Sequence, residues 1–374
     1  MAFKDITKVF YDGQIKLDYK DKAHRYYARP RINWDLPESD PKAWGKIMYP
    51  KGVTTLIGDT LEKKGLMQWP KNVALRELFG YYGAFEVEGD DGEVRKMPAG
   101  FSKGVGTLGQ NGEIIDIGDQ SLLEVVDSAA KGWQRKQKKG ADIGSVVHDA
   151  IEHLIKGQDF DIAENYAWNI KESEYDSEAM RTKAMEEFDE DVAMAMKAFL
   201  RFQKWWFTVT PELHSAEDIL YSLEYNICGT YDADLSIATK HHPKPELFSD
   251  KEMVRCTTDW KTSNASASKE AAAPEGVYYS YFLQDALYEL MRRELGQEPA
   301  DDLLVVSARK DGEFSLIYAS ECGLTVEECV DWARAVIFCY RIAEKTKKGL
   351  LAHAEEAVEE SEPTQPTKNS KEEF

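Results

Sequence analysis

Four short segments of the chain combine side chains that can hold a divalent cation and act on a phosphate ester. They are GSVVHDAIE at 144–152, GTYDADL at 229–235, TTDWKTS at 257–263 and QDALY at 284–288. Carboxylate oxygens suit hard cations such as Mg²⁺, and a histidine in the same set shifts the preference toward Mn²⁺. The four segments together therefore indicate a site for a divalent cation.

Two of these segments follow the four-residue spacing of a helix face. His148 and Glu152 are four positions apart, and so are Gln284 and Tyr288. Because residues at i and i+4 lie on the same side of a helix, each pair presents both side chains in one direction. Either pair alone is typical of an ordinary helix surface, and only the ordered set of all four segments indicates a site.

The other two segments are predicted strands that carry aspartates. Asp259 and Lys261 are two positions apart, so both side chains point to the same face of their strand. Asp232 and Asp234 are expected to share a face in the same way, and spacing alone does not decide between them. An ammonium group beside a metal-binding carboxylate can polarise water or stabilise a phosphoryl transition state, as phosphodiester hydrolysis requires.

The composition excludes several classes of protein. The 374 residues carry 47 Lys and Arg against 67 Asp and Glu, and the net charge of −20 argues against a protein that coats nucleic acid through bulk charge. No run approaches about 18 apolar residues, so no membrane span is expected, and the N-terminal residues lack the features of a signal or transit peptide. Five cysteines without C-x-x-C spacing indicate reduced thiols and a cytoplasmic location, the host cytoplasm if a phage encodes the protein.

The hydropathy pattern predicts the elements that must position these segments. Helices are expected over 121–139, 141–156, 183–207, 276–295 and 325–348, with Gly140 and Gly157 ending the first two. Strands are expected over 215–227, 229–238, 253–261, 302–308 and 313–320, the last two forming a hairpin. This order predicts an α/β fold with a central mixed β-sheet flanked by helices.

The regions on either side of this core differ from it. Residues 1–118 mix short strand-like pieces, loops and one helix expected around 69–79, which predicts an N-terminal accessory region of mixed α+β structure. Residues 119–350 are expected to form the core domain, with a surface loop at 239–252. The segment 351–374 is rich in acids and too poor in apolar residues to bury a core, so we expect a disordered acidic tail.

The ordered motifs resemble the RecB-like branch of the PD-(D/E)XK nuclease superfamily, in particular phage-type exonucleases related to mitochondrial genome maintenance exonucleases. The residues that match the family's motifs are Gly144, His148, Glu152, Glu217, Gly229, Asp232, Asp259, Lys261, Gln284 and Tyr288. The Gly-x-x-Asp motif favours Asp232 over Asp234, and the likeness extends over residues 17–340. The chain departs from the family pattern at Tyr231, where a proline often stands, and in the long insertion at 239–252.

The resemblance implies a restriction-endonuclease-like core that holds Mg²⁺ or Mn²⁺. The implied metal ligands are His148, Asp232, Asp259 and the backbone carbonyl of Trp260. No iron–sulfur cluster is expected, because the variants that carry one need an N-terminal cysteine and this chain has none before Cys228.

The resemblance also implies roles in catalysis and substrate binding. Asp232, Asp259 and Lys261 would be catalytic, with Glu152 and Glu217 in supporting positions. Gln284 and Tyr288 would place the DNA backbone.

A basic segment lies directly before the helix of His148. KGWQRKQKKG at 131–140 carries five cations in a protein of net charge −20. Lysines at a helix end also satisfy the helix dipole, and that explanation has equal weight. As a DNA contact, the segment would bind phosphates and stack an unpaired base through Lys131, Trp133, Arg135, Lys136, Lys138 and Lys139.

The motifs and the resemblance together predict a hydrolase, a Mg²⁺- or Mn²⁺-dependent DNA exonuclease of phage DNA recombination, repair or degradation. One alternative is a structure-specific endonuclease such as a junction resolvase, which cuts a closed circle that an exonuclease leaves intact. Another is a non-catalytic DNA- or protein-binding member of the fold, against which the intact set of Asp232, Asp259 and Lys261 argues. DNA is the expected partner, and the acidic tail is compatible with a single-strand annealing or binding protein. The sequence predicts no particular oligomeric state.

Overall fold

The computed structural model describes residues 5–20, 23, 25–61, 84–88, 94–98, 107–108, 114–116, 122–172, 182, 185–262 and 279–361. Between 84 and 137, at 171–172 and from 352 to 361 it describes the backbone alone. In this part of the chain, no helix combines the length and the apolar character needed to cross a bilayer.

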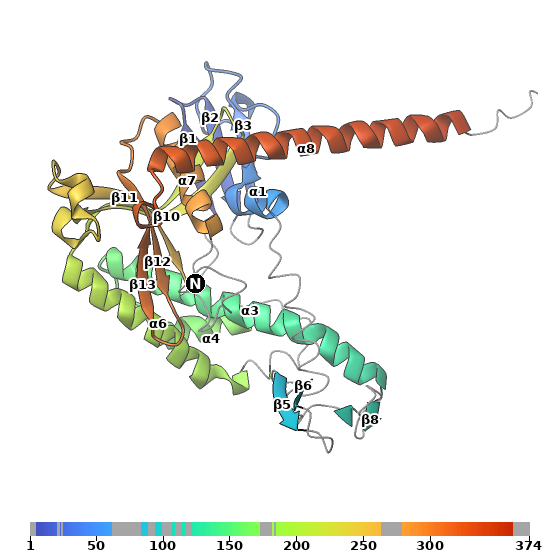
Figure 1. Ribbon diagram of the computed structural model, residues 1–374. Coiled ribbons are helices and arrows are strands. Elements are labelled where there is room, and N and C mark those ends of the chain that lie inside the picture. Colours follow the sequence, from blue (N-terminus) through green and yellow to red (C-terminus); the bar gives the residue numbers. More distant parts are fainter. Residues whose placement is uncertain are drawn as a thin grey trace, which may run out of the picture.

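A six-stranded mixed sheet forms the centre of the molecule (Figure 1). Its strands are β4 (Lys51–Gly52), β9 (Glu212–Ser222), β10 (Ile227–Ala238), β11 (Met253–Lys261), β12 (Asp302–Ala308) and β13 (Phe314–Tyr318). The order is β13-β12-β11-β10-β4, and β9 also pairs with β10. β11 runs parallel to β12 and β10 parallel to β4, while the other pairs are antiparallel. The predicted α/β architecture with a mixed sheet is confirmed.

Helices cover both faces of this sheet, as Figure 1 shows. On one face lie α3 (Leu122–Ile155), α4 (Ile162–Glu172) and α6 (Phe188–Val209). On the other lie α1 (Val53–Thr60), α7 (Tyr279–Glu294) and α8 (Val326–Ser361). α8 has 36 residues, about 54 Å of helix, and its C-terminal part continues beyond the body of the molecule as a rod.

The strand β12 shows why this sheet lies between two layers of helices. Leu303 and Val305 pack in the core under α7 and α8, whereas Leu304 and Val306 pack in the core under α3 and α6. Because successive strand residues point to opposite faces, a strand with apolar residues at four consecutive positions must be covered on both sides. Each such fully buried side chain stabilises the fold by about 1.5–3 kcal/mol relative to exposure.

The N-terminal region is attached to this sheet. β1 (Ile6–Phe10), β2 (Ile15–Lys20) and β3 (Arg25–Pro30) form a three-stranded antiparallel sheet. Its core residue Leu17 belongs to the same cluster as Ile219 and Tyr221 of β9. β4 then pairs directly with Ile227 and Cys228 of β10, so residues from within 1–118 form part of the central sheet.

Short elements fill the remaining connections. The 3-10 helix η2 (Pro41–Ala43) precedes β4, and two hairpins, β5 (Ala84–Glu88) with β6 (Val94–Pro98) and β7 (Thr107–Leu108) with β8 (Ile114–Asp116), precede α3. The segment predicted as a loop at 239–252 contains the 3-10 helices η3 (Thr239–His241) and η4 (Pro245–Phe248), and η6 (Ala319–Cys322) leads into α8.

Three helix predictions differ from the structure or lie outside it. α3 runs unbroken through Gly140, whose carbonyl accepts a 3.0 Å hydrogen bond from Lys310 Nζ, because one glycine costs a helix only about 1 kcal/mol relative to alanine. The predicted break there is wrong. α8 continues to Ser361, so helical backbone occupies the first part of the segment predicted as a disordered tail. The helix expected at 69–79 lies outside the described residues.

Candidate metal-binding and catalytic site

The candidate site lies where β10 and β11 separate. These strands pair from Ala238 and Met253 to Ala233 and Thr258, where the ladder ends. One residue further along β10, the Oδ2 atom of Asp232 accepts a 2.6 Å hydrogen bond from the Trp260 backbone N–H. The carboxylate thus bridges the two strands at the point where they diverge.

The helix α3 brings His148 to this fork. Its Nδ1 lies 3.9 Å from Asp232 Oδ2, and its side chain is 30% exposed. One turn earlier, an added Cβ at Gly144 would lie 2.8 Å from Thr262 Oγ1. Gly144 therefore lets α3 approach the end of β11 closely enough for the imidazole to reach the carboxylate.

Glu217 enters the site through an unusual backbone conformation. It has a φ of 50° in the middle of β9, where it lies opposite Asp232 in the interrupted β9–β10 ladder. Positive φ is rare for a residue with a side chain, and it redirects the chain locally. One ligand atom each from Glu217, His148 and Asp232 lie within 4.8 Å of one another. The sequence placed Glu217 in a supporting position, whereas the geometry places it among the candidate ligands.

Asp259 and Lys261 point toward α7, where Gln284 connects them. Lys261 forms an ion pair with Asp259. The amide of Gln284 donates to Asp259 Oδ1 at 3.1 Å and accepts from Lys261 Nζ at 3.3 Å. Asp259 thus adjoins the cluster of His148, Glu217 and Asp232, where it contacts Asp232 and pairs with an ammonium group.

Tyr288 completes this arrangement one turn further along α7. Gln284 Nε2 donates to the Tyr288 hydroxyl at 3.2 Å, and the tyrosine is 3% exposed. An added Cβ at Gly229 would lie 2.8 Å from Tyr288 Cε1, so the glycine makes room for the ring. In this structure Gln284 and Tyr288 hold Asp259 and Lys261 in place, and the predicted contact with a DNA backbone stays a prediction.

Burial raises the pKa of the three carboxyl groups. Burial raises the pKa of Glu217 well above its usual value, and Asp232 and Glu152 add to the effect. Burial likewise raises the pKa of Asp232, against the opposing charge of Lys261. The pKa of Asp259 rises to about 7 through burial and the charge of Asp232, although Lys261 opposes it. Such a cluster ionises readily only when further positive charge is supplied.

The two nitrogen groups of the site differ in charge: the imidazole is neutral and the ammonium is positive. Burial and the charge of Lys261 lower the pKa of His148 to about 4, although Asp259 and a hydrogen bond with the Trp260 backbone oppose the shift. The imidazole is therefore neutral near pH 7 and has a lone pair to offer. Burial alone would lower the pKa of Lys261, but Asp259 and Asp232 more than reverse this, so its ammonium stays charged.

These donors fit a hard divalent cation. One imidazole and two carboxylates gather within 4.8 Å, and the Trp260 backbone lies against the same imidazole. Oxygen donors with one nitrogen suit Mg²⁺ or Mn²⁺. His148, Asp232 and the Trp260 carbonyl of the predicted ligand set are brought together with Glu217, and Asp259 adjoins them.

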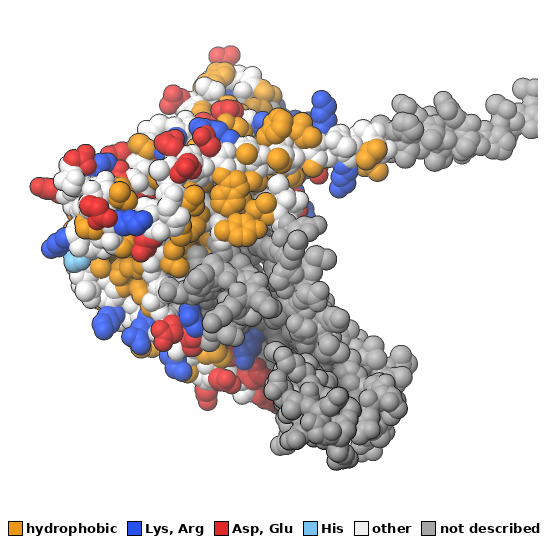
Figure 2. All heavy atoms as spheres, viewed as in Figure 1, with side chains coloured by type: hydrophobic (Ala, Val, Ile, Leu, Met, Phe, Trp, Pro, Cys, Tyr) orange, Lys and Arg blue, Asp and Glu red, His pale blue; other side chains and the backbone are white. Residues whose placement is uncertain are grey.

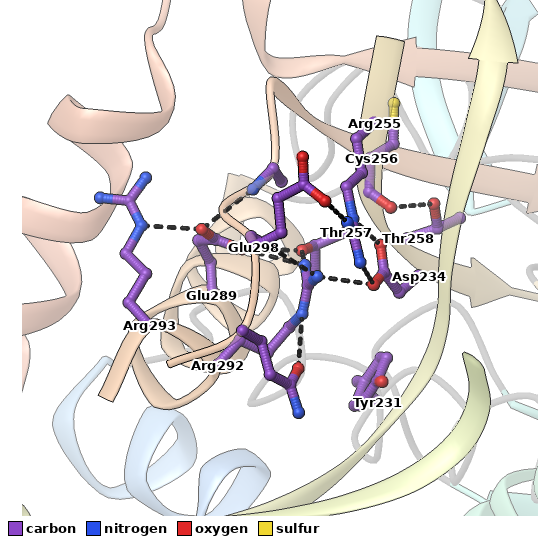
Figure 3. Close-up of polar contacts among 12 residues, drawn as sticks. Tyr231, Asp234, Arg255, Cys256, Thr257, Thr258, Glu289, Arg292, Arg293 and Glu298 are labelled. Carbon is purple, nitrogen blue, oxygen red and sulfur yellow. Dashed lines mark hydrogen bonds and ion pairs between the residues drawn. The ribbon is translucent and has the colours of Figure 1, made fainter. Parts of the chain in front are cut away.

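Asp234 belongs to a different cluster of polar side chains, which Figure 3 shows. It is 2% exposed and forms ion pairs of 2.6 Å with both Arg255 and Arg292. The expectation that Asp232 and Asp234 share a face is wrong, because Asp232 meets His148 of α3 and Asp234 meets Arg292 of α7.

The cause is an interruption of the strand alternation at Asp232. Tyr231 packs in the core under α7, whereas Ala233, two positions on, packs in the core under α3. The interruption lies opposite the left-handed Glu217, where the β9–β10 ladder lacks a pair.

Other predicted residues lie further from the cluster. Glu152 forms an i, i+4 ion pair with Lys156, and its negative charge helps to raise the pKa of Glu217. Lys139 is bound by Glu187 at 2.6 Å and Asp191 at 2.7 Å, so it must exchange these partners to bind a phosphate. The side chains of Lys131, Trp133, Arg135 and Lys136 lie outside the described part, and Lys138 makes an interaction within the protein.

Asp285 is a residue of this region that the sequence did not single out. It is fully buried next to Gln284, and neither of its carboxylate oxygens has a hydrogen-bond partner among the described residues. Burial and the charge of Asp259 raise the pKa of Asp285 well above its usual value. An acid within the apolar pattern of FLQDAL was the signal that could have found it.

Comparison with known proteins adds no relative: no family model matches the chain, and no curated protein matches it.

Proposed function

We propose that the protein is a Mg²⁺- or Mn²⁺-dependent deoxyribonuclease with a restriction-endonuclease-like core, acting as an exonuclease. The observation that carries the proposal is the gathering of His148, Glu217 and Asp232 within 4.8 Å, with the Asp259–Lys261 ion pair beside them. Support for the PD-(D/E)XK class comes from the order of the motifs along the chain. A role in phage DNA recombination, repair or degradation, with a DNA-binding protein as partner, belongs to the same proposal.

The chemistry that we propose divides among the chain's own residues. A bound Mg²⁺ or Mn²⁺ would supply Lewis acidity toward a phosphodiester oxygen and orient water. Neutral His148 and the carboxylates of Asp232 and Glu217 would hold it, with the Trp260 carbonyl. The charged Lys261 would stabilise the negative charge that develops on the attacked phosphate, and Gln284 fixes its position through Oε1.

The test uses purified full-length protein with end-labelled linear duplex, closed circular duplex and single-stranded DNA, each with Mg²⁺, Mn²⁺ or EDTA. Lys261→Ala and Asp259→Ala are expected to lower the cleavage rate by about 10²–10³-fold, as the loss of one electrostatic group does. Lys204→Ala and Asp250→Ala, at exposed positions of the same residue types, serve as matched controls.

Three outcomes separate the alternatives. Metal-dependent loss of label from linear DNA with an intact circle supports the exonuclease. A cut circle makes the protein an endonuclease, in which case branched junctions are the next substrate. Metal binding without cleavage of any substrate makes it a non-catalytic binding member, and equal activity of Lys261→Ala and the unmodified protein excludes this site as the catalytic centre.

A further inference from the structure

A hollow of about 510 Å³, apart from the candidate metal site, lies between α8 and the start of β10. Four of its lining residues are cations, Lys51, Arg341, Lys345 and Lys348, and a single one, Glu344, is an acid. In a protein with a net charge of −20 this is a local reversal of sign. Figure 2 shows Lys and Arg side chains on both sides of α8 where the helix leaves the body.

Two of the cations are already held within the protein and two extend into solvent. Lys51 pairs with Asp59 at 2.6 Å, and Arg341 donates to the Glu224 carbonyl at 2.8 Å. Lys345 and Lys348 are exposed, three positions apart on one side of α8. Asp59 neutralises Lys51, so Arg341, Lys345 and Lys348 against Glu344 give the hollow its net positive charge, and the exposed pair can close on an anion.

Tyrosines share this lining with the cations. The Lys51 ammonium lies 5.2 Å from the centre of the Tyr340 ring, and the Arg341 guanidinium lies 5.4 Å from that of Tyr225. Tyr49 is 69% exposed and contacts the Tyr27 ring edge-on at 5.8 Å, which leaves most of its surface to solvent. An exposed aromatic face beside paired lysines fits a planar base attached to a phosphate.

We infer that this hollow binds one strand of nucleic acid, with phosphates on Lys345 and Lys348 and an unpaired base on Tyr49. The inference deepens the proposed function, since the strand would be that of the nuclease substrate. Ile227 lines the hollow and Asp232 lies five residues further along the same strand, about 16 Å away or about five nucleotides at duplex spacing. An acidic peptide would use the cations but gain nothing from the tyrosine faces, so nucleic acid is the better fit.

The binding of phosphates by Lys345 and Lys348 is tested by fluorescence anisotropy. A labelled 20-nucleotide single strand is titrated with full-length protein in EDTA at several salt concentrations. Each phosphate contact of a single strand contributes about 0.7 to the slope of log K against log salt. Lys345→Gln/Lys348→Gln is expected to lower the slope by about 1.4 and to weaken binding about 25-fold at 0.1 M salt. Lys347→Gln/Lys204→Gln removes the same charge from exposed positions outside the hollow, and we expect its slope to stay unchanged.

The stacking of a base on Tyr49 is tested with Tyr49→Ala and two probes, the same single strand and a strand of equal length without bases. Stacking of one base contributes about 1–3 kcal/mol, so we expect a loss of about tenfold for the normal strand and none for the abasic strand. An equal loss for both probes overturns the stacking role. Displacement of the strand by polyglutamate at equal charge concentration, as effectively as by unlabelled DNA, overturns the assignment to nucleic acid.

The outcomes distinguish this inference from the proposed nuclease. If the protein cleaves DNA but the two double variants bind alike, the hollow is not the strand site and the nuclease proposal stands. If Lys345→Gln/Lys348→Gln alone loses binding while no condition gives cleavage, the strand site stands and the nuclease proposal fails.

Discussion

Asp232 and Asp234 lie two residues apart on the same strand, yet their surroundings are opposite in kind. Asp234 is paired with two guanidinium groups, and Glu289 beside it is bound by Arg292 and Arg293. Asp232 is grouped with other acids, among them Glu217 and Asp259, around the Lys261 ammonium. The first group is neutralised by fixed cations of the chain, whereas the second holds more acids than the Lys261 ammonium can neutralise.

This difference in charge balance decides what each of the two buried clusters can do. A buried carboxylate that is paired on all sides binds nothing further, and its contribution is structural. A buried carboxylate held among other acids has a raised pKa and, because no cation neutralises it, can still attract one. The arginine network therefore stabilises the sheet against α7, while the excess of acids at the fork of β10 and β11 supports the proposed cation site.

The largest effect is expected when the buried ion pairs around Asp234 are broken. Arg292→Met removes a fully buried guanidinium from Asp234 and Glu289 and leaves their charges partly unpaired. We expect the free energy of unfolding to fall by about 3–5 kcal/mol, measured by urea denaturation. Arg334→Met, which breaks an exposed pair with Asp331, is the control and should change it by less than about 1 kcal/mol. A loss for Arg292→Met as small as that of the control would contradict the structural role.

The second largest effect is expected when Mn²⁺ binds to the acidic cluster around Asp232. Mn²⁺ at about 100 times its Kd is expected to raise the free energy of unfolding of the unmodified protein by about 2.7 kcal/mol, because it binds only the folded site. Asp232→Asn and Glu217→Gln should lose this stabilisation while remaining folded in EDTA. Asp234→Asn, by contrast, should lower stability and keep the response to Mn²⁺. A Mn²⁺ response that survives in Glu217→Gln would remove Glu217 from the ligand set.

A smaller effect concerns the glycine that admits Tyr288 to the site. In Gly229→Ala the new Cβ would lie 2.8 Å from Tyr288 Cε1 and 3.2 Å from Val53 Cγ2. We expect a loss of about 1–3 kcal/mol in thermal or urea unfolding, together with reduced activity through the displaced Gln284. Gly58→Ala in α1 meets nothing within 4 Å and should instead gain up to about 1 kcal/mol. Equal effects of the two substitutions would show that the close approach of Tyr288 is unimportant.

The smallest effect is the pH dependence of the metal-free protein. The pKa of Asp259 is about 7 in the fold against 3.8 ordinarily, so unfolding releases a proton between these values and stability falls as pH rises. The pKa of His148 is about 4 against 6.5, so unfolding takes up a proton there and stability rises with pH. Each group contributes at most about 1.4 kcal/mol per pH unit, and the two oppose each other between about pH 4 and 6.5.

Two variants separate these contributions by urea denaturation in EDTA at a series of pH values. Asp259→Asn is expected to remove the falling contribution and leave stability rising toward pH 6.5. His148→Gln is expected to do the reverse. Parallel stability curves for both variants would mean that neither group titrates in this window.

The sequence predicted the elements well where periodicity and turn residues are strong. The strands β10 to β13 and the helix α7, which holds Gln284, lie within about three residues of their predicted bounds. β9 ends five residues before its predicted end, β4 was not predicted, and the helix of His148 ends as predicted but begins at Leu122. The predicted break at Gly140 is wrong because one glycine costs a helix only about 1 kcal/mol relative to alanine, which the rest of a 34-residue helix outweighs.

The site was predictable in its residue types but less so in its geometry. The motif residues His148, Asp232, Asp259 and Lys261 do meet where β10 and β11 separate. Strand alternation failed between Asp232 and Asp234, because the interruption depends on a backbone angle of Glu217 on the neighbouring strand. The partner of Asp234 was equally hidden, since an arginine near the end of a helix is usually exposed and Arg292 is not.

The positive φ of Glu217 has a consequence for how the chain tolerates substitution. Side chains disfavour this angle by about 1–2 kcal/mol, whereas glycine adopts it freely and asparagine more easily than most residues. In a library of all residues at this position, sorted once for folding and once for activity, glycine and asparagine should rank high in the first sort and low in the second. A single backbone torsion would then mark where selection has favoured chemistry over ease of folding.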